Sequence, residues 1–428
     1  MFVDALKVLR ERGHLEWCNN EEGLGGLFQS EMVTGYVGFD PTADSLHVGH
    51  LIPIMALAWM QRCGHRPIAL AGVGTGLIGD PSGKSKERNL LTLEEVFHNA
   101  ESVKKQLAHF LDFDCGSNSA LMLNNYDWLK DLSFIDVLRG LGKYFSVNAM
   151  ISREYVKHRL EDPEKSISYT EFSYVLLQAY DFLHLFQNYG CRLQMGGNDQ
   201  QGNLLSGTDV IRRHVGGEAF AATQPLLLTS AGTKFGKTED GAVWLDAART
   251  SPYKFYQFWV NTEDVAVERL LKLYTFLPLE EIGALMEEHS QEPGRRLAQR
   301  RLAQEVTAMV HGAESARTAE KSSAILFGDA FDPTELSKDI LVALAGEVPT
   351  GTAERAFPAP LVDVLTASGA CASKSEARRL IKGGGLYVNG MRAAEEDRTV
   401  SEKDILAGRF LFVRMGKKRF HMVLFDDE

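Results

Sequence analysis

The sequence predicts an α/β protein with a parallel sheet covered by helices on both faces, then a helical domain and a small α/β domain. From about Val33 to Thr229, short β-branched or glycine-bounded runs such as 68–73 and 191–195 alternate with longer helical patterns, an alternation typical of parallel sheets. From Ser251 to about Phe327, apolar residues recur at helical spacing. The remaining tail contains two turn signals between short apolar runs, which indicates a small mixed domain.

Length and charge limit the kind of molecule. The 428 residues exceed one ordinary core and indicate two or three units. With 46 basic and 57 acidic side chains, the formal charge of -11 argues against a protein coated in nucleic acid. Any contact with RNA should therefore be local.

Cysteine use and hydropathy predict a cytoplasmic protein without a membrane span. The five cysteines are widely spaced and include no C-x-x-C pair, so neither a disulfide framework nor a zinc site is supported. No apolar run approaches the length needed to cross a bilayer. Residues 1–17 have no unbroken apolar stretch, so we expect neither a signal nor a transit peptide.

The first motif, HVGH at 47–50, follows the strand-like run 33–39. It places His47 and His50 at the start of a predicted helix, where free backbone amides and the helix dipole favour phosphate. Gly49 leaves room for a base or a ribose. Taken alone, such a motif could equally be a pair of exposed or capping histidines. The order of strand, turn and helix around it favours a phosphate site.

A glycine-containing stretch at 79–85 invites a P-loop interpretation. Only three residues separate Gly79 from Gly83, so the P-loop spacing fails. Lys84 and Arg88 lie four residues apart and could still reach a pyrophosphate or a carboxylate. The alternative is a solvated charged turn.

A second cationic segment, KFGKT at 234–238, lies in a loop opened by Gly232. Its two lysines could close over phosphates and neutralise the charge that develops during nucleotidyl transfer. Alone, a K-x-x-K turn is usually just solvated.

Three polar residues, Tyr174, Gln178 and Asp181, fall at i, i+4 and i+7 of the helical stretch 172–185 and so share one face. Because their neighbours are mostly apolar, this stripe either faces water or lines a pocket. Asp181 and Tyr36 together could hydrogen-bond a buried phenol hydroxyl. A site of that kind rejects the analogue without the hydroxyl, because its own polar groups would stay unpaired.

The run GGNDQ at 196–200 follows the predicted strand 191–195. It presents backbone, a carboxylate and an amide at a strand terminus, where parallel sheets bind ligands. Asp199 suits a ribose hydroxyl, although an ordinary glycine turn with an Asx cap would look the same.

The C-terminal tail carries a local basic surface. A capping-box sequence at 373–376 opens a helix that should end at the glycines of 383–385, and 416–419 forms a basic turn. Breakers between about Leu344 and Pro360 indicate a linker before this helix. The candidate RNA contacts are Lys374, Arg378, Arg379, Lys382, Lys417, Lys418 and Arg419.

Taken together, these residues make the chain resemble bacterial tyrosyl-tRNA synthetase, a class I aminoacyl-tRNA synthetase family, over nearly its whole length. The HIGH motif of the family corresponds to HVGH at 47–50 and its KMSKS motif to KFGKT at 234–238. We therefore expect a Rossmann-like catalytic domain at 1–230, the KMSKS-type loop with an α-helical anticodon-side domain at 231–330, a linker at 331–357 and an S4-like RNA-binding domain at 358–428.

The resemblance also implies a role for each site residue. Tyr36 and Asp181 would read the phenol hydroxyl. Asp80, Tyr174 and Gln178 would hold the α-amino group, with Gln200 near the carboxylate. The expected ATP contacts are Gly38, Asp40, Thr42, His47, Gly49, His50, Gly197, Asp199 and Lys237. The residues expected to act on the phosphates in catalysis are His47, His50, Lys84, Arg88, Lys234, Lys237 and Thr238.

Three positions depart from the family pattern. Pro53 stands where many relatives place a hydroxyl near the ribose, and Val37 replaces a polar or thiol residue of some relatives. Gln201 occupies a position where an aromatic residue is common. None of these changes removes a group that the chemistry needs.

The implied function is that of a tyrosine--tRNA ligase. The tyrosine carboxylate attacks the α-phosphate of ATP to give tyrosyl-adenylate and pyrophosphate, and tyrosine is then transferred to the 3' end of tRNA(Tyr). ATP is a substrate, Mg2+ accompanies its phosphates and no protein-bound metal is expected. The implied assembly is a homodimer that works with L-tyrosine, ATP and tRNA away from membranes. Two alternatives remain: a tryptophanyl-tRNA synthetase, or an RNA-binding or splicing factor on a silent synthetase scaffold.

Overall fold

The computed structural model describes residues 3–82, 91–162, 167–229, 232–238, 241–327 and 333–425, with the backbone alone at 154, 155, 237, 238 and 333. The chain forms two compact units, Met1–Thr250 with Thr262–Leu302, and Ser251–Asn261 with Ala303–Glu428. Within the described ranges, no helix is long and apolar enough to cross a membrane.

A six-stranded sheet forms the centre of the first unit, in the order β1, β6, β5, β2, β3, β4. All neighbours pair in parallel except β1, which runs antiparallel to β6. The predicted parallel sheet is confirmed, and its order reverses between β2 and β5, where open α/β sheets bind ligands. The strands are β1 (Trp17–Cys18), β2 (Thr34–Phe39), β3 (Arg66–Ala71), β4 (Leu121–Asn124), β5 (Cys191–Gly197) and β6 (Phe220–Gln224).

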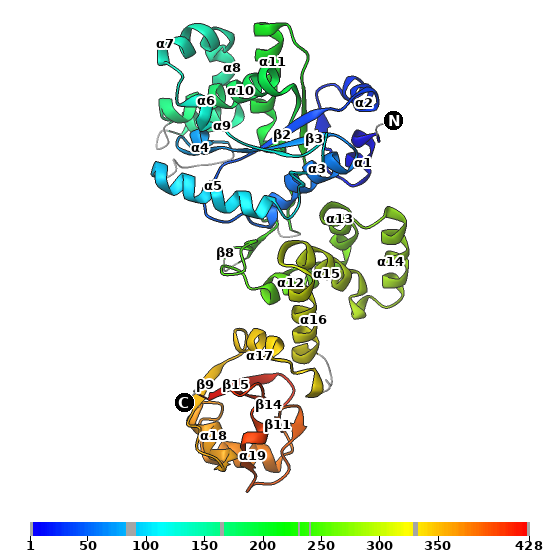
Figure 1. Cartoon of the computed structure of the whole chain (residues 1–428), viewed down its shortest axis with the longest axis vertical. Coiled ribbons are helices and arrows are strands. Elements are labelled where there is room, and N and C mark those ends of the chain that lie inside the picture. The colour runs from blue at the N-terminus through cyan, green and yellow to red at the C-terminus, as the bar shows by residue number, and fades with distance from the viewer. Residues whose placement is uncertain are drawn as a thin grey trace. The chain divides into compact units, whose positions relative to one another are not determined.

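Helices cover both faces of this sheet. Figure 1 shows α3 (Leu51–Arg62) and α5 (Leu93–Leu107) along one face, and α10 (Tyr169–Tyr189) and α11 (Gln201–Val215) along the other. Because both faces are covered, the central strands are nearly continuous apolar runs, as in β3. The short helices at the sheet margins are α1 (Ala5–Glu11), α2 (Glu21–Ser30) and α4 (Val73–Gly76).

Helix α10 is fixed at both ends by its sequence. Ser168 and Glu171 form a capping box at its start, and Gly190 ends it with a φ of 62°, a left-handed conformation that glycine adopts without strain. The buried Glu171 also forms a two-pronged ion pair with Arg159, at 2.7 and 3.0 Å. The polar stripe predicted on this helix is therefore carried by a firmly held element.

Between β4 and α10 the chain forms a series of short helices, several of which leave apolar side chains exposed, including Phe134, Ile135 and Val147. They are α6 (Tyr126–Leu129), α7 (Phe134–Asp136), η2 (Val137–Leu141), η3 (Gly142–Tyr144), α8 (Val147–Ile151) and α9 (Glu154–Glu161).

The helices predicted from 251 to 327 are present. Ser251 caps the first of them and Pro252 occupies its first turn. In the first unit α13 packs against α14, and in the second α12 packs against α16, so the two units divide the helical stretch between them. The helices are α12 (Pro252–Val260), α13 (Asp264–Tyr274), α14 (Leu279–Gln291), α15 (Leu297–His311) and α16 (Ala313–Phe327).

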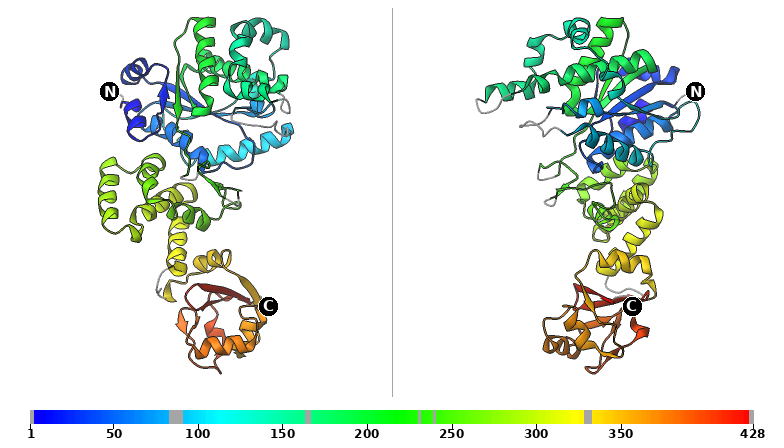
Figure 2. Two further views of the ribbon diagram at one scale, coloured as in Figure 1. Left: turned by 180° about the vertical axis from the view of Figure 1, so that it is seen from behind. Right: turned by 60° about the vertical axis from the view of Figure 1, so that its left-hand side comes forward.

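The C-terminal part of the second unit is a five-stranded sheet in the order β12, β11, β14, β15, β9. Figure 2 shows the orange helices α18 and α19 along one face of its red strands. The predicted turn at Asn389 and Gly390 joins β11 to β12, with both residues at positive φ. The elements are β9 (Thr350–Ala353), β10 (Ala359–Pro360), α18 (Leu361–Ala367), α19 (Lys374–Lys382), β11 (Leu386–Val388), β12 (Met391–Arg392), β13 (Thr399–Val400), β14 (Phe410–Met415) and β15 (Arg419–Phe425).

The linker expected at 331–357 is not a plain connection. Helix α17 (Lys338–Ala345) buries Ile340, Leu341 and Leu344 against the face of the C-terminal sheet opposite α18 and α19. Strand β9 then pairs in parallel with β15. Local breakers suggested a linker there, but the apolar side of α17 and the backbone pairing of β9 make residues 338–353 part of the C-terminal fold.

Candidate active site and nucleic-acid interface

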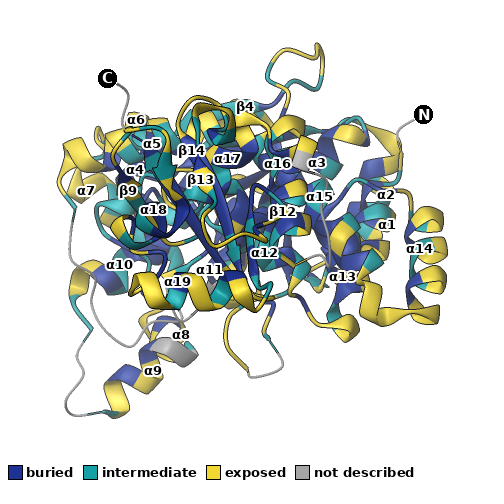
Figure 3. Cartoon of the chain, turned by 90° about the horizontal axis from the view of Figure 1, so that it is seen from below, coloured by how far each residue is buried: buried dark blue, intermediate teal, exposed yellow. Residues whose placement is uncertain are grey.

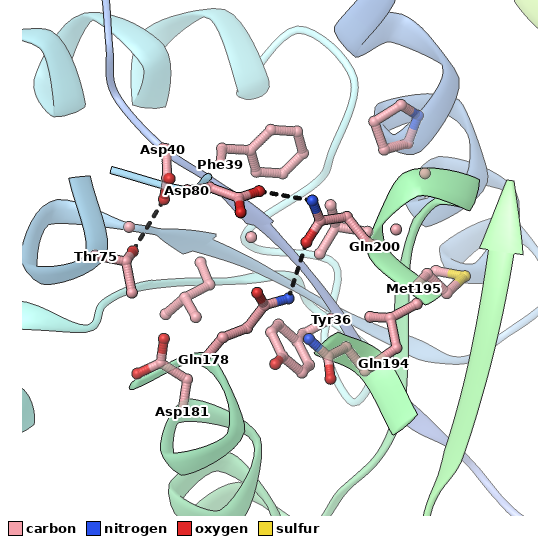
Figure 4. A pocket seen from close by; sticks show the side chains of 18 of the residues that line it. Tyr36, Phe39, Asp40, Thr75, Asp80, Gln178, Asp181, Gln194, Met195 and Gln200 are labelled. Atoms are coloured by element: carbon pink, nitrogen blue, oxygen red, sulfur yellow. Dashed lines mark hydrogen bonds between the residues drawn. The ribbon is translucent and has the colours of Figure 1, made fainter. Parts of the chain in front are cut away.

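A cavity of about 300 Å³ opens at the carboxyl ends of β2 and β5, at the switch point of the sheet. Figure 4 shows Tyr36 from β2 and two residues of α10, Gln178 and Asp181, directed into it. Twelve of the predicted site residues line the cavity: Tyr36, Gly38, Asp40, Thr42, His50, Asp80, Tyr174, Gln178, Asp181, Gly197, Asp199 and Gln200. The structure thus brings together residues that span more than 160 positions of the sequence.

The closed end of the cavity holds a carboxylate and a phenol. Asp181, 2% exposed, accepts hydrogen bonds from Asn125 Nδ2 at 2.9 Å and from Trp128 Nε1 at 2.8 Å. Burial raises the pKa of Asp181 to about 7, although these two donors oppose the rise. The hydroxyl of Tyr36, whose side chain is 1% exposed, has no hydrogen-bond partner among the described residues. Burial and the nearby Asp181 hold the pKa of Tyr36 well above its usual value.

An unpaired buried hydroxyl beside a buried carboxylate is costly in the empty protein. A ligand hydroxyl placed between them can accept from Tyr36 and donate to Asp181 when that carboxylate is ionised. This end of the cavity is therefore suited to a phenol.

The supports of Asp181 were missed in the sequence. Asn125 follows β4 directly and Trp128 lies in α6, while Thr75 lies in α4, after β3. Asn125 also donates to Thr75 at 3.0 Å, and its carbonyl oxygen accepts from the amide of Gly74 at 2.7 Å. Their only sequence signal was position after a strand end, the same rule that located 196–200.

Asp40, at the end of β2, links the two predicted parts of the site. Its Oδ1 accepts from the Thr75 hydroxyl at 2.9 Å and its Oδ2 from the Tyr174 hydroxyl at 3.1 Å. Burial and the nearby carboxylate of Asp40 hold the pKa of Tyr174 well above its usual value. A Cβ on Gly72 would lie 2.2 Å from Oδ1 of Asp40, so only glycine permits this approach.

A second polar chain crosses the cavity, as the dashed lines of Figure 4 show. Gln200 Nε2 donates to Asp80 at 2.6 Å, and Gln178 Nε2 donates to Gln200 at 3.4 Å. The carbonyl oxygen of Gln178 is buried without a partner among the described residues. One carboxylate and one unused acceptor can therefore receive an ammonium group here.

The HVGH segment binds its own amides, which corrects the expectation that they are free for phosphate. His47 Nδ1 accepts from the amide of Gly49 at 3.0 Å, and His50 Nδ1 accepts from the amide of His47 at 3.1 Å. The amides of Val48 and His50 bond to the carbonyls of Val243 and His47. All four amide groups are used, so any phosphate contact must come from the imidazoles.

Within this segment only His50 lines the cavity, while His47 and Gly49 lie beside it. The rings of His47 and His50 are in contact, with a centroid distance of 3.9 Å and planes tilted by 36°. Burial and the neighbouring His47 lower the pKa of His50 to about 3. His50 is consequently a neutral hydrogen-bonding group at physiological pH.

The segment KFGKT at 234–238, called the lysine loop below, lies against the HVGH segment. A Cβ on Gly236, whose φ is +85°, would lie 3.1 Å from Cβ of Val48. Lys234 is exposed and does not line the cavity, but its charge opposes the desolvation that raises the pKa of Asp199. The backbone of Lys237 and Thr238 forms β7, paired with β8 (Gly241–Ala242). Their side chains, and the whole of Lys84 and Arg88, lie outside the described residues.

The basic residues of the C-terminal domain fall into two groups. Lys374 pairs with Asp363 at 2.7 Å and Lys382 with Glu396 at 3.0 Å. Arg419 pairs with Glu376 at 3.1 Å. Among the described residues no ion pair engages the other four, which are Arg378, Arg379, Lys417 and Lys418. Figure 3 shows the outer face of α19 exposed. These four residues are therefore better candidates for RNA contacts than the three that form ion pairs.

Comparisons with known proteins agree with the geometry. The family model for tRNA synthetases class I (W and Y) matches residues 29–328, and that for the tyrosine--tRNA ligase SYY-like C-terminal domain matches 340–423. A tyrosine--tRNA ligase of Roseiflexus castenholzii is 49% identical over 422 residues, 98% of either chain, and one of Anaeromyxobacter dehalogenans is 50% identical over 94% of this chain and 95% of its own. A C-terminally truncated mitochondrial tyrosyl-tRNA synthetase of Aspergillus nidulans superimposes with a TM-score of 0.68 and 34% identity, covering 76% of this chain and 94% of its own.

Proposed function

The chain belongs to the class I tRNA synthetases (W and Y) and acts as a tyrosine--tRNA ligase, and we propose that its cavity binds tyrosine with the phenol between Tyr36 and Asp181. The single observation that carries this assignment is the hydroxyl of Tyr36, which has no partner in the described part of the chain and lies beside the buried carboxylate of Asp181. A substrate hydroxyl completes both groups, whereas an unsubstituted ring leaves them unpaired. The tyrosine enzymes are themselves the standard example of this rule.

The other end of the cavity receives the tyrosine backbone. Asp80, Gln178 and the hydroxyl of Tyr174 surround the α-amino group, with the amide of Gln200 beside the carboxylate. The hydrogen-bond chain from Asp80 to Gln200 to Gln178 supports this placement, because it fixes the side chains before substrate arrives. Prior ordering lowers the entropy that binding must otherwise supply.

ATP lies across the switch point of the sheet. Asp199, with Gly197 behind it, takes the ribose, and Gly38, Asp40 and Thr42 border the adenylate. His50 contacts the phosphates through Nε2, since its Nδ1 accepts a backbone amide. His47 stands beside it, with its Nδ1 likewise engaged.

The remaining positive charge comes from lysine and arginine side chains. Lys234, Lys237 and Thr238 of the lysine loop, together with Lys84 and Arg88, approach the pyrophosphate as it leaves. Magnesium enters with ATP as part of the substrate. Catalysis then consists of alignment and of neutralising charge on the departing oxygens, without a protein nucleophile.

Catalysis and tRNA binding are assigned to three regions of the chain. Residues 1–230 form the catalytic domain, 231–330 carry the lysine loop and the anticodon-side helices, and 358–428 contact tRNA. In the last region the contacts are Arg378 and Arg379 of α19 and the two lysines of the turn at 417–418. These side chains form no ion pair within the described ranges, so none has to be broken before they contact phosphate.

The active form is a homodimer. Support comes from the exposed apolar side chains of α7 and η2, notably Ile135, which is 68% exposed, and Leu138. Beside them lies an apolar groove of about 190 Å³ walled by Leu132, Val137, Leu141 and Leu183. An exposed apolar surface of this kind is typical of a subunit interface.

The working compartment is the cytoplasm. All five cysteines are unpaired thiols, four of them buried, which fits a reducing environment. The similarity to bacterial tyrosine--tRNA ligases, which act in protein synthesis, points to the same compartment.

One assay tests the assignment: amino-acid-dependent exchange of labelled pyrophosphate into ATP, run with each of the twenty amino acids. We expect exchange with tyrosine alone, followed by charging of tRNA(Tyr). Exchange with tryptophan alone would make the protein a tryptophanyl-tRNA synthetase. Absence of exchange with every amino acid would leave an RNA-binding protein on a silent scaffold.

A further inference from the structure

One aromatic contact near the phenol end is not part of the substrate-binding set. His184 lies three residues after Asp181 on α10, and its ring stacks on the indole of Trp128 from α6, with a centroid distance of 4.2 Å and an angle of 13° between planes. The same indole donates its N–H to Asp181 at 2.8 Å. His184, Trp128 and Asp181 therefore form a closed arrangement across two helices.

The indole needs support from outside its own helix. Helix α6 has only four residues and no side-chain hydrogen bond at its start, and a single helical turn is only weakly stable by itself. An N–H···O bond weakens steeply when the donor turns away from the acceptor. The indole packs against the hydrophobic cluster beneath the cavity, and the ring stacked flat on it restricts its rotation further. The stack therefore helps to hold the N–H on Asp181.

We propose that His184 is a positioning residue for tyrosine recognition, which holds Trp128 in the orientation that keeps its N–H on Asp181. The inference rests on the proposed role of Asp181 at the phenol hydroxyl. It adds a residue that lines no part of the cavity. Since the stack requires a flat ring rather than a charge, another aromatic ring should replace it.

Because of the charged and polar groups around Asp181, loss of this positioning should change the pH dependence of tyrosine recognition. Polar and titratable groups from three parts of the fold face Asp181. They are Asn125 and Trp128 after β4, Tyr36 in β2 and Asp40 at the end of that strand, and Tyr174 and Tyr180 on α10. The indole N–H is one of the two donors that stabilise its ionised form. Loss of that donor raises the pKa of Asp181 further, which leaves less carboxylate to accept the phenol hydroxyl near neutral pH.

The change in pH dependence does not come from titration of the His184 imidazole itself. Burial lowers the pKa of His184, which disfavours the charged form of its ring. Around it lie Trp128 and, farther away, the rings of Tyr180 at 6.4 Å and Tyr189 at 6.3 Å. A non-titrating ring at this position separates the effect of stacking from any effect of charge.

The test compares His184→Ala with His184→Phe by tyrosine-dependent pyrophosphate exchange between pH 5.5 and 9. For His184→Ala we expect KM for tyrosine to rise about threefold to tenfold, the range for loss of an aromatic pair, with a smaller change in kcat. The acidic limb of kcat/KM should also move to higher pH. His184→Phe should restore both toward the parent values, and His98→Ala, at an exposed site on α5, should change neither.

Equal losses in the Ala and Phe variants, or an acidic limb that stays in place, would overturn the proposal. Trp128→Phe provides a second route if His184→Ala does not fold, because it keeps a ring and removes the donor. It should move the acidic limb in the same direction, and an unmoved limb would refute the role of the N–H. Failure of the proposed function looks different, because the unmodified protein would then show no exchange with tyrosine.

Discussion

The hydroxyl of Tyr174 donates a hydrogen bond to Oδ2 of Asp40 over 3.1 Å, which joins α10 to the end of β2. The other oxygen of Asp40 accepts from Thr75, so the carboxylate is fixed on both sides. Both residues line the cavity, and in the proposed binding mode Tyr174 belongs to the tyrosine end and Asp40 to the ATP end. If that binding mode holds, this hydrogen bond links the two substrate sites before either substrate is present.

We expect Tyr174→Phe to impair the use of both substrates. The change keeps the ring but removes the donor to Asp40, and hydrogen bonds to charged groups contribute about 1.5–3 kcal/mol. In pyrophosphate exchange, kcat/KM for ATP should fall roughly tenfold to a hundredfold, and kcat/KM for tyrosine should fall as well. Tyr169→Phe, an exposed site on the same helix, is the matched control. An effect on tyrosine alone would show that the bond does not couple the sites.

Tyr36→Phe should stabilise the empty protein while weakening tyrosine binding. Its buried hydroxyl has no partner among the described residues, so its removal ends a desolvation cost of about 1 kcal/mol or more. The substrate phenol, however, then loses its donor. Thermal unfolding without ligand should shift upward, whereas KM for tyrosine should rise and the preference over phenylalanine should fall. A lower unfolding temperature with unchanged KM would mean that the hydroxyl serves the fold instead.

Because of Asp181, we expect the free energy of unfolding and the affinity for tyrosine to change in opposite directions with pH. Its pKa is raised from 3.8 to about 7 by burial, so the folded state binds more protons than the unfolded state between these values. The contribution of Asp181 to the free energy of unfolding is therefore greatest below about pH 4. It falls by roughly 4 kcal/mol in total as the pH rises toward 7. Affinity for tyrosine improves over the upper part of the same range, because ionised Asp181 accepts the phenol hydroxyl.

Two pH series check this prediction: chemical denaturation without ligand, and KM for tyrosine. Asp181→Asn removes the titrating group and should flatten both contributions. A variant that keeps the full pH dependence of KM would assign the titration to another group.

In the C-terminal domain we expect tRNA binding to depend most on Arg378 and Arg379, which form no ion pair with any residue that the structure describes. Arg378→Ala with Arg379→Ala should weaken tRNA binding and reduce the dependence of log K on log salt by about 0.7 for every phosphate that is no longer neutralised, the value for single strands. Lys374→Ala with Lys382→Ala should have a smaller effect, because those side chains already pair with Asp363 and Glu396. Filter binding at several salt concentrations measures both, while pyrophosphate exchange should remain unchanged.

The apolar surface near α7 should determine the oligomeric state. Ile135→Glu places a charge on a side chain that is 68% exposed beside the apolar groove, and burying an unpaired charge in an interface costs several kcal/mol. Analytical ultracentrifugation should show a shift from dimer to monomer. Val265→Glu, at an 89% exposed residue of α13, is the control that keeps the dimer. A dimer unaffected by Ile135→Glu would place the interface elsewhere.

Local sequence was most informative where a single element carries the site. Tyr174, Gln178 and Asp181 could be grouped by helical spacing alone, and all three line the cavity. The strand ends likewise located Asp40 and Asp199. In contrast, Asn125 and Trp128 lie 56 and 53 residues from Asp181, and no periodic pattern connects residues that far apart.

The HVGH segment shows how a correct location can carry a wrong detail. Its position at the start of α3 was predicted from the strand and turn before it. The amides expected to bind phosphate instead bond to His47, His50 and Val243. One of these partners lies almost 200 residues away, so only the folded chain could reveal that the amides are occupied.

For this protein, the sequence by itself determined the alternation of helices and strands and the side chains that we propose for tyrosine and ATP, because periodicity and residue type act over a few residues. The tertiary structure alone decided which groups satisfy one another: Asp181 with Trp128 and Asn125, Asp40 with Tyr174, and α17 with the C-terminal sheet. Such pairings depend on how distant elements pack. Packing fixes both the burial that raises the pKa of Asp181 and the position of the Tyr36 hydroxyl, which has no partner among the residues that the structure describes.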